Sequence, residues 1–336
     1  MKAFFGFGLI LISLTVLQSY KTQLSDNHDG ELSGVFSVSP TRKVKFSQGN
    51  LQYCPATETW RFADYQWETI GEANITHGTD SNYNGWLDMF TFLSSGWFDG
   101  ENINYKPTSR NNSVVKTTPN GKKYNYMGYG PSCDSENPDD MRYDWGMYNP
   151  IINGGNKSGL WRTMTDAEFF YLLFEREVTP TEYSKQCKLK TKRKNAKPVE
   201  YYNGFATLLI NGCKIYGVVI LPDYWNGAKN SGNFKSLGDA KDLCSEGIIK
   251  QHYSDNIYTY QSWLEMEKNG ALFLPVVYCL NKYVVCYSLF QDYNWELAKE
   301  ITNDYRRCVT NGGQTLNDGL ISKSTPIPVR LIKDIN

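Results

Sequence analysis

Two close pairs of carboxylates are the first candidates for chemistry in this chain: Asp139 with Asp140, and Glu265 with Glu267. Paired carboxylates carry out acid–base catalysis when they share a desolvated site, but neighbouring carboxylates on a surface are usually solvated. We interpret both pairs as solvated. The sequence also lacks G-x-S-x-G, H-E-x-x-H, Walker and G-x-G-x-x-G motifs, so no catalytic constellation is predicted.

Cysteine and histidine are the other candidate ligands and nucleophiles. The even number of cysteines permits disulfides in an exported chain without fixing their connectivity. There is no C-x-x-C, and the three histidines are scattered, which argues against a zinc site. We expect buried free thiols or a few disulfides, with no metal and no other cofactor. The eight cysteines are residues 54, 133, 187, 213, 244, 279, 286 and 308.

The charge balance excludes a long-range electrostatic field. The 336-residue chain has 35 acidic and 35 basic side chains, so we expect no nucleic-acid partner and no attraction to an anionic membrane. Residues 188–197 form a basic run, which we interpret as a solvated loop face, with an anion-binding patch as the alternative. An aromatic content of 15% indicates a rigid, loop-rich body that contains β-structure.

The N-terminus has the pattern of a secretory signal peptide. Lys2 supplies the positive charge, residues 3–17 the apolar run, and residues 17–19 a cleavage site. We therefore predict a signal peptide over residues 1–19, with a retained N-terminal anchor as the alternative. A polar, flexible leader is predicted over residues 20–32, and a single domain over residues 33–336. The expected location is secreted, periplasmic or at the cell surface, without membrane insertion after signal removal.

Two segments have the start or stop signals of helices. Thr165 and Glu168 form the T-x-x-E pattern of a capping box, and Met164 can pack on Phe169 as a hydrophobic staple. Helical spacing continues from Phe169 through Leu172, Leu173 and Arg176. A second helix is predicted over residues 258–268, ending at Asn269 and Gly270.

Strand signals surround these helices. Asn211-Gly212 favours a type I′ turn and predicts a hairpin of residues 205–210 and 213–221. Alternating residues over 34–53 predict an opening hairpin around Pro40-Thr41. The other predicted strands are residues 60–62, 271–279, 283–289 and 326–332. Residues 71–144 are predicted as a long structured loop, which either serves a function or is packed by its own aromatic residues. This pattern, without β-α-β alternation, indicates an α+β fold.

Residues 160–169, L-W-R-T-M-T-D-A-E-F, resemble the W-R-x-P-T-E-A-E-W opening of the sulfatase-modifying-factor branch (formylglycine-generating enzyme-like) of the C-type lectin fold. The chain is similar, more closely still, to the large paralogous sets of secreted lectin-fold proteins of anaerobic gut bacteria, through its segments 144–146, 153–155, 220–225 and 270–275. The resemblance covers about residues 33–334. It implies a C-type lectin-like α+β fold, in one domain, with the last strand beside the opening hairpin.

The same resemblance supplies an enzymatic alternative. Enzymes of that branch oxidise a cysteine of their substrate with copper held by two cysteines four residues apart, followed by R-x-A-x-R. This chain has Cys279 and Cys286 with six residues between them and no R-x-A-x-R. Residues 136–139 and 225–227 likewise depart from the calcium-binding motifs of sugar-binding C-type lectins. A copper-dependent formylglycine-generating oxidase is therefore the alternative to a non-enzymatic protein.

The function that remains is binding of an extracellular glycan or protein. In the resembling proteins the loops present one recognition face, and Tyr, Trp and Arg dominate recognition hot spots. The candidate ligand-binding residues there are Tyr287, Phe290, Tyr293, Trp295, Tyr305 and Arg306. The alternatives are that these aromatics only pack the loop, that the site lies between Trp86 and Tyr143, or that the protein is a structural or fimbrial surface component.

Overall fold

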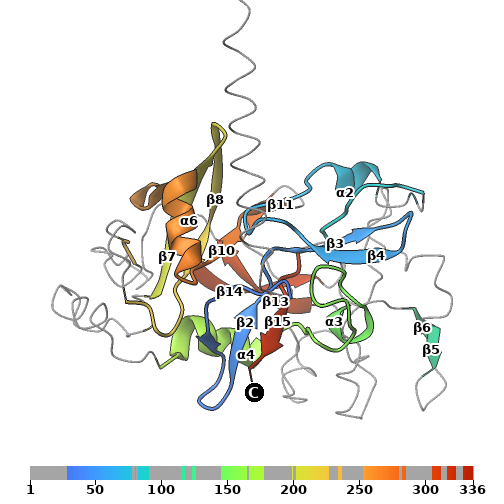
Figure 1. Ribbon diagram of the computed structural model, residues 1–336, viewed down its shortest axis with the longest axis horizontal. Helices are drawn as coiled ribbons and strands as arrows, with labels where there is room; N and C mark the ends of the chain where they lie inside the picture. Colours follow the sequence, from blue (N-terminus) through green and yellow to red (C-terminus); the bar gives the residue numbers. More distant parts are fainter. Residues whose placement is uncertain are drawn as a thin grey trace, which may run out of the picture.

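The chain folds as a mixture of short helices and mainly antiparallel strands, an α+β arrangement, as predicted (Figure 1). The computed structural model describes residues 29–77, 80, 82–90, 115–117, 123–125, 145–164, 166–177, 199, 202–226, 234–236, 253–279, 282–284, 305–311, 316–322 and 328–335. The predicted signal peptide and most of the leader lie outside these ranges.

The largest sheet has the order β10-β8-β7-β9. Its centre is the predicted hairpin, in which Asn211 (φ 50°) and Gly212 (φ 81°) provide the two positive φ angles of a type I′ turn. β9 pairs with β7 in parallel, and the other pairs are antiparallel. The strands are β7 (Asn203–Ile210), β8 (Cys213–Ile220), β9 (Ile257–Thr259) and β10 (Leu272–Pro275).

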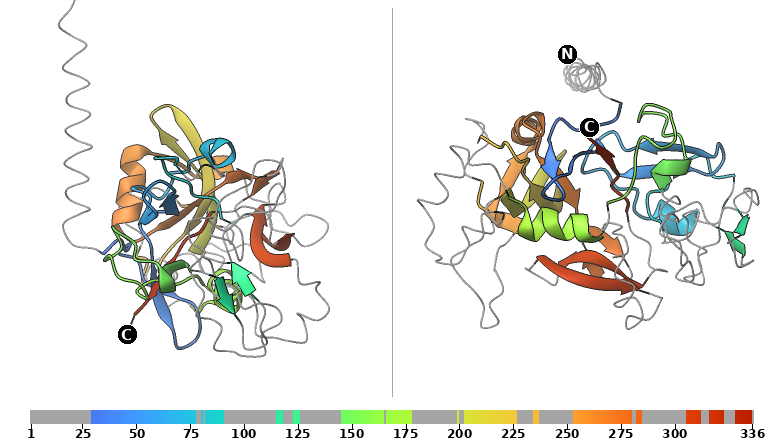
Figure 2. Two further views of the ribbon diagram at one scale, coloured as in Figure 1. Left: turned by 90° about the vertical axis from the view of Figure 1, so that its right-hand side faces the viewer. Right: turned by 90° about the horizontal axis from the view of Figure 1, so that it is seen from below.

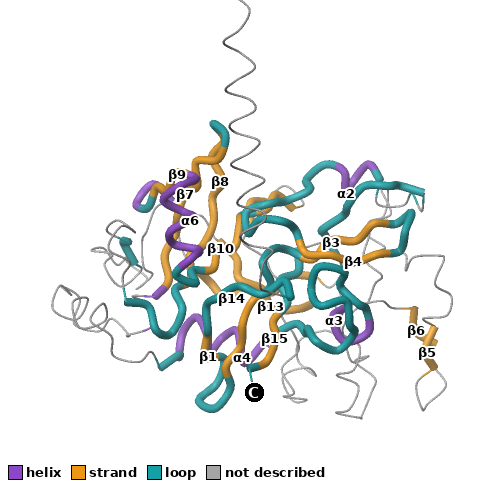
Figure 3. The backbone as a smooth tube through the Cα atoms, in the orientation of Figure 1, coloured by secondary structure: helices purple, strands orange, loops and turns teal. Residues whose placement is uncertain are grey.

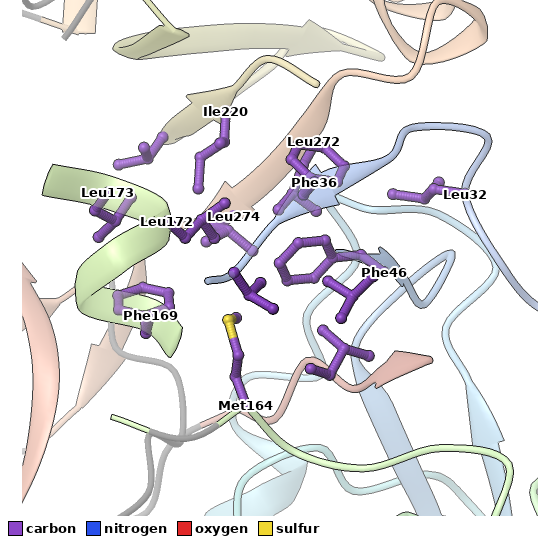
Figure 4. Packing of buried hydrophobic residues seen from close by; sticks show 14 of the residues in the cluster. Leu32, Phe36, Phe46, Met164, Phe169, Leu172, Leu173, Ile220, Leu272 and Leu274 are labelled. Atoms are coloured by element: carbon purple, nitrogen blue, oxygen red, sulfur yellow. The ribbon is translucent and has the colours of Figure 1, made fainter. Parts of the chain in front are cut away.

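The two faces of this sheet bury different apolar clusters because side chains alternate along a strand. Leu208 and Val219 pack in one cluster with Trp263 of helix α6 (Tyr260–Lys268). On the other face, Val218 shares a second cluster with Leu172 of the first predicted helix. Figure 4 shows this second cluster, which also holds side chains from the opening and closing strands. The sheet is therefore a layer between two helical segments.

The first predicted helix is present but changes type along its length. α4 (Asp166–Phe170) is followed directly by a π-helical turn, Tyr171–Glu175, where the Arg176 N–H donates to the Tyr171 carbonyl at 2.7 Å. Met164 and Phe169, the predicted staple, are both buried in the same cluster (Figure 4). Thr165 lies outside the described residues, so its half of the capping box stays a prediction.

Helix α6 begins two residues later than predicted, because Tyr258 belongs to β9 and pairs with β7. Its N-cap is Thr259, whose hydroxyl accepts the Ser262 N–H. The predicted end is confirmed: Gly270 has φ +91°, its N–H donates to the Glu267 carbonyl, and the next N–H donates to Met266. These two bonds form a Schellman motif.

The last strand lies beside the opening hairpin, as the resemblance implied. β1 (Phe36–Ser37), β2 (Lys43–Phe46) and β15 (Ile332–Asp334) form an antiparallel sheet in the order β1-β2-β15. Packed structure starts slightly before the predicted boundary at residue 33. Leu32 is buried, and Glu31 forms an ion pair with Lys333 at 3.2 Å.

A third cluster of apolar residues lies under a separate hairpin, β3 (Leu51–Cys54) with β4 (Thr59–Phe62). The predicted strand at residues 60–62 is thus confirmed. The long stretch 71–144 is not all loop, because it contains one short helix and one short hairpin. They are α2 (Ala73–Thr76) and the hairpin of β5 (Val115–Thr117) with β6 (Lys123–Asn125).

The C-terminal third contributes two more hairpins. β11 (Val277–Cys279) pairs with β12 (Lys282–Val284), and β13 (Tyr305–Asn311) pairs with β14 (Leu316–Ser322) in a curved ribbon (Figure 2). The tube in Figure 3 shows how much of the described body is loop, including the chain that follows the short helix α3 (Trp145–Tyr148).

Candidate functional site

The predicted loop face lies mostly outside the described residues, including Tyr287, Phe290, Tyr293 and Trp295. Tyr305 and Arg306 are described, and they open strand β13, opposite Ser322 and Ile321 of β14. The prediction that Tyr305 and Arg306 lie on a loop was wrong: they belong to a hairpin strand, because residues 305–311 pair along their whole length with β14. Whether this region binds a ligand stays a prediction.

Arg162, in the segment at residues 160–169, holds distant parts of the chain together. The Arg162 guanidinium donates two hydrogen bonds to the Glu168 carboxylate at 2.8 Å and two to Asp334 at 2.7 Å, tying helix α4 to β15. Burial alone would lower the pKa of Arg162, but the hydrogen bonds to Asp334 and Glu168 outweigh it and raise that pKa. Charge-assisted, bidentate pairs of this kind are strong.

The Asp223 and Arg176 side chains form a second, fully buried pair. Their Oδ1 and Nη1 atoms lie 3.2 Å apart, and Arg176 also donates to the Leu221 carbonyl at 3.0 Å. The Asp223 carboxylate accepts the Ser37 N–H and hydroxyl at 3.1 and 2.6 Å. Burial lowers the pKa of Arg176. The pair joins β1, β8 and the end of the π-helical turn, so these charges serve the fold.

The glycine and asparagine motifs are also structural. The Asn153 side chain accepts the Phe62 N–H at 2.7 Å and donates to the Phe62 carbonyl at 2.9 Å, which closes the 153–155 turn onto β4. A Cβ on Gly146 would collide with the Trp161 carbonyl. The contacts of Asn153 and Gly146 therefore give these motifs a role in packing. They do not indicate a chemical reaction.

The carboxylate and cysteine candidates are not brought together in the described chain. Glu265 is exposed, but Glu267 is 7% exposed, so its interpretation as a solvated group was wrong; it lies on the α6 side that packs on the sheet. Asp139, Asp140 and Cys286 lie outside the described residues. Cys54 is a buried free thiol and Cys213 an exposed one.

The described ranges hold no group of three or more His, Cys, Asp or Glu side chains placed to bind a metal ion. None of their helices has the length and apolar character needed to cross a membrane.

The strongest candidate surface is the outer side of the β3–β4 hairpin. Gln52 pairs with Arg61 across the hairpin, on the side opposite the buried Tyr53 and Trp60. Leu87 adds a third extended segment, because it exchanges backbone hydrogen bonds of 2.8 and 2.9 Å with Tyr53. The preceding residue, Trp86, therefore lies on the outer side, and the Arg61 guanidinium carbon is 4.1 Å from its ring centroid.

Hydrogen bonds hold this surface, which we call the hairpin face and define as Gln52, Arg61, Glu68 and Trp86. The Arg61 Nε–H donates to Gln52 Oε1 at 2.8 Å, and Gln52 Nε2 donates to Glu68 Oε1 at 3.3 Å. Arg61 Nη2 lies 4.0 Å from the same Glu68 oxygen. The side chains of Arg61 and Glu68 are 23% and 29% exposed and Trp86 is partly exposed, whereas Gln52 is fully buried. The part of the face that solvent reaches is therefore Arg61, Glu68 and Trp86, with Gln52 as a buried support.

Hydrogen bonds of Asp88 hold the Trp86 segment in place. Its buried carboxylate accepts the Ile70 N–H at 3.0 Å and an Asn74 amide N–H at 2.8 Å, while the Asn74 oxygen accepts the Asp88 N–H. Burial raises the pKa of Asp88 to about 6, and the nearby negative charge of Glu68 adds to this. The network fixes the backbone that carries Trp86.

Part of this face had a signal in the sequence. In L-Q-Y and W-R-F, Gln52 and Arg61 alternate with buried apolar residues, which predicts that both leave the core on the same side. Trp86 lies in a long stretch of sequence without periodicity. Among the sequence predictions, only the alternative site between Trp86 and Tyr143 reaches this residue. No family model matches the chain, and neither a curated protein nor a solved structure matches it.

Proposed function

We propose that this is a non-enzymatic binding protein, secreted or displayed at the cell surface, that recognises an extracellular ligand. The observation that carries the proposal is the Arg61–Trp86 stack on the hairpin face. Tryptophan and arginine are enriched at recognition hot spots, and binding costs less when side chains are already held in place. Gln52 and Glu68 hold Arg61 in this way.

In the described chain the buried charges hold segments together, and this use supports a binding function over catalysis. Arg162 and Arg176, with their carboxylate partners, are engaged in contacts between segments. The Arg61–Trp86 pair of the hairpin face, by contrast, is partly exposed. The predicted loop face, with Tyr287, Tyr293, Trp295, Tyr305 and Arg306, is retained as a second candidate surface of the same protein.

We also propose that the α+β body is a C-type lectin-like fold. Its support is the closing strand β15 beside the opening hairpin, together with two helical segments against one mainly antiparallel sheet. The proposal for export rests on Lys2 and the apolar run that follows it.

A combined glycan and protein array tests the function. The full chain should bind at least one class of probe, and Trp86→Ala should remove that binding. Tyr224→Ala is the matched control, because Tyr224 is an aromatic residue that is 59% exposed and whose side chain contacts Lys43 of β2. Absence of binding to every probe would contradict the proposal, and equal losses in both variants would point to a general effect on the protein.

A further inference from the structure

The hairpin face keeps hydrogen-bonding groups unused. Among the described residues, neither Arg61 Nη1 nor Trp86 Nε1 has a hydrogen-bond partner, whereas Arg61 Nε donates to Gln52. The Glu68 oxygens accept one hydrogen bond each, from the Gln52 side chain and from the Asp64 N–H. A carboxylate oxygen can accept two, so donors and acceptors are both available beside the indole.

The charges around the face sum to neutral or negative. The positive charge of Arg61 is opposed by Glu68 at 4.0 Å. The buried carboxylate of Asp88 is close enough to feel the charge of Glu68, which contributes to the raised pKa of Asp88. An anionic ligand would therefore find no excess positive charge on the face, and a cationic one would meet the guanidinium.

We infer that the hairpin face is a subsite for a neutral saccharide, with hydroxyls shared between Arg61 and Glu68 beside the Trp86 ring. Each sugar hydroxyl both donates and accepts, which matches the mixed groups of the face, and a flat indole suits the apolar face of a sugar ring. A stable protein interface buries roughly 800 Å² on each partner, far more than four side chains offer. The inference rests on the proposed binding function and specifies its ligand class.

Titration with two sets of oligosaccharides tests the inference. The full chain is titrated with neutral hexose oligosaccharides and, separately, with sulfated or uronic-acid oligosaccharides, by calorimetry. We expect binding to members of the neutral set only. Arg61→Lys should weaken it at least tenfold, because lysine keeps the charge but loses the planar fork that holds Gln52 and a hydroxyl together. Trp86→Ala should abolish it, and Tyr224→Ala should leave it unchanged.

The outcomes separate the ligand class from the function. Binding of acidic oligosaccharides alone, or of proteins alone on the array, would overturn the neutral-saccharide subsite and keep the binding function. Neutral-sugar binding that survives both Trp86→Ala and Arg61→Lys would move the subsite to another surface. No binding to saccharide or protein would overturn the proposed function itself. Thermal unfolding of each variant identifies any that fails to fold. If Trp86→Ala does not fold, the affinity of Arg61→Lys for the neutral oligosaccharides alone decides whether the subsite lies on the hairpin face.

Discussion

Buried arginines in this protein hold distant segments together. The Arg330 guanidinium donates to the carbonyls of Ser47, Gln66 and Phe273, at 3.1, 2.9 and 3.3 Å. It thereby links three segments to the C-terminal chain. They are the residues just after β2, the segment after β4, and strand β10. Arg176 has the same kind of role through Asp223. Such groups are costly to remove singly, because the partner stays buried.

The Arg176–Asp223 pair gives a prediction on this scale. Arg176→Met should lower the free energy of unfolding by about 3–5 kcal/mol, because it leaves the Asp223 carboxylate buried without its cation. The double variant Arg176→Met, Asp223→Asn should lose less than the single one, since the remaining amide is neutral. Urea unfolding of the three proteins measures both values. A double variant less stable than Arg176→Met would contradict the account of the pair.

Asp88 predicts an unusual dependence of stability on pH. Its pKa is about 6 in the folded protein against 3.8 as the ordinary value, so the folded state binds the proton more tightly. This group therefore adds stability as the pH falls from about 6 towards 3.8, by up to about 3 kcal/mol, and that contribution is lost again as the pH rises. Asp88→Asn should remove it.

The protein must be compared with its Asp88→Asn variant, because the pKa values of other groups are shifted in the opposite direction. The hydrogen bond from Arg162 lowers the pKa of Asp334, so the stability from that group is lost on acidification. Denaturant midpoints of both proteins, taken at about pH 7.5 and about pH 5, isolate Asp88 in the difference between them. An identical pH response in the two proteins would show that Asp88 has no raised pKa.

At the scale of elements, the ends of the two main helical segments depend on local side chains. Removal of a capping hydroxyl costs about 1 kcal/mol, so Thr165→Ala should lower stability by that amount without affecting ligand binding. Thr259→Ala is the matched variant, because the Thr259 hydroxyl accepts the Ser262 N–H at 3.3 Å. Denaturant midpoints decide the result. A loss for Thr259→Ala but none for Thr165→Ala would mean that the predicted capping box does not form.

Local signals explain what the sequence could predict at this scale. Asn211-Gly212 and Gly270 have positive φ angles that their own residue types favour, so the hairpin turn and the end of α6 were predictable. The start of α6 was not, because pairing of β9 with β7 decides it. The contact of Arg61 with Trp86 joins segments separated by a long irregular connection, and no pattern of spacing encodes it.

At the scale of the whole molecule, three apolar clusters lie under the two hairpin regions and the main sheet. Gln66 connects two of these regions, since its side chain donates to the Ala271 carbonyl at 3.1 Å and accepts the Phe273 N–H at 2.7 Å. The single domain over residues 33–336 stays a prediction. The Gln66 contacts place the hairpin face on a body that can hold it rigidly.

Export is the whole-molecule prediction from the N-terminal pattern. The mature protein from its native host should begin within a few residues of Tyr20, because signal peptidase removes the segment after the predicted site at residues 17–19. Terminal sequencing of the purified protein measures this. Recovery of an intact Met1 from the soluble cytosol would refute both the signal peptide and the proposed location.

The central claim is that the hairpin face contacts the ligand, and the indole resonances of the nine tryptophans measure this directly. The protein is labelled with ¹⁵N at tryptophan, the Trp86 signal is assigned with Trp86→Ala, and the Trp295 signal with Trp295→Ala. On titration with the ligand found on the array, the Trp86 Nε1–H signal should shift more than any other, because its donor is then engaged. A shift confined to Trp295 would place recognition on the 287–306 loop face, and an unmoved Trp86 signal at saturation would contradict the account.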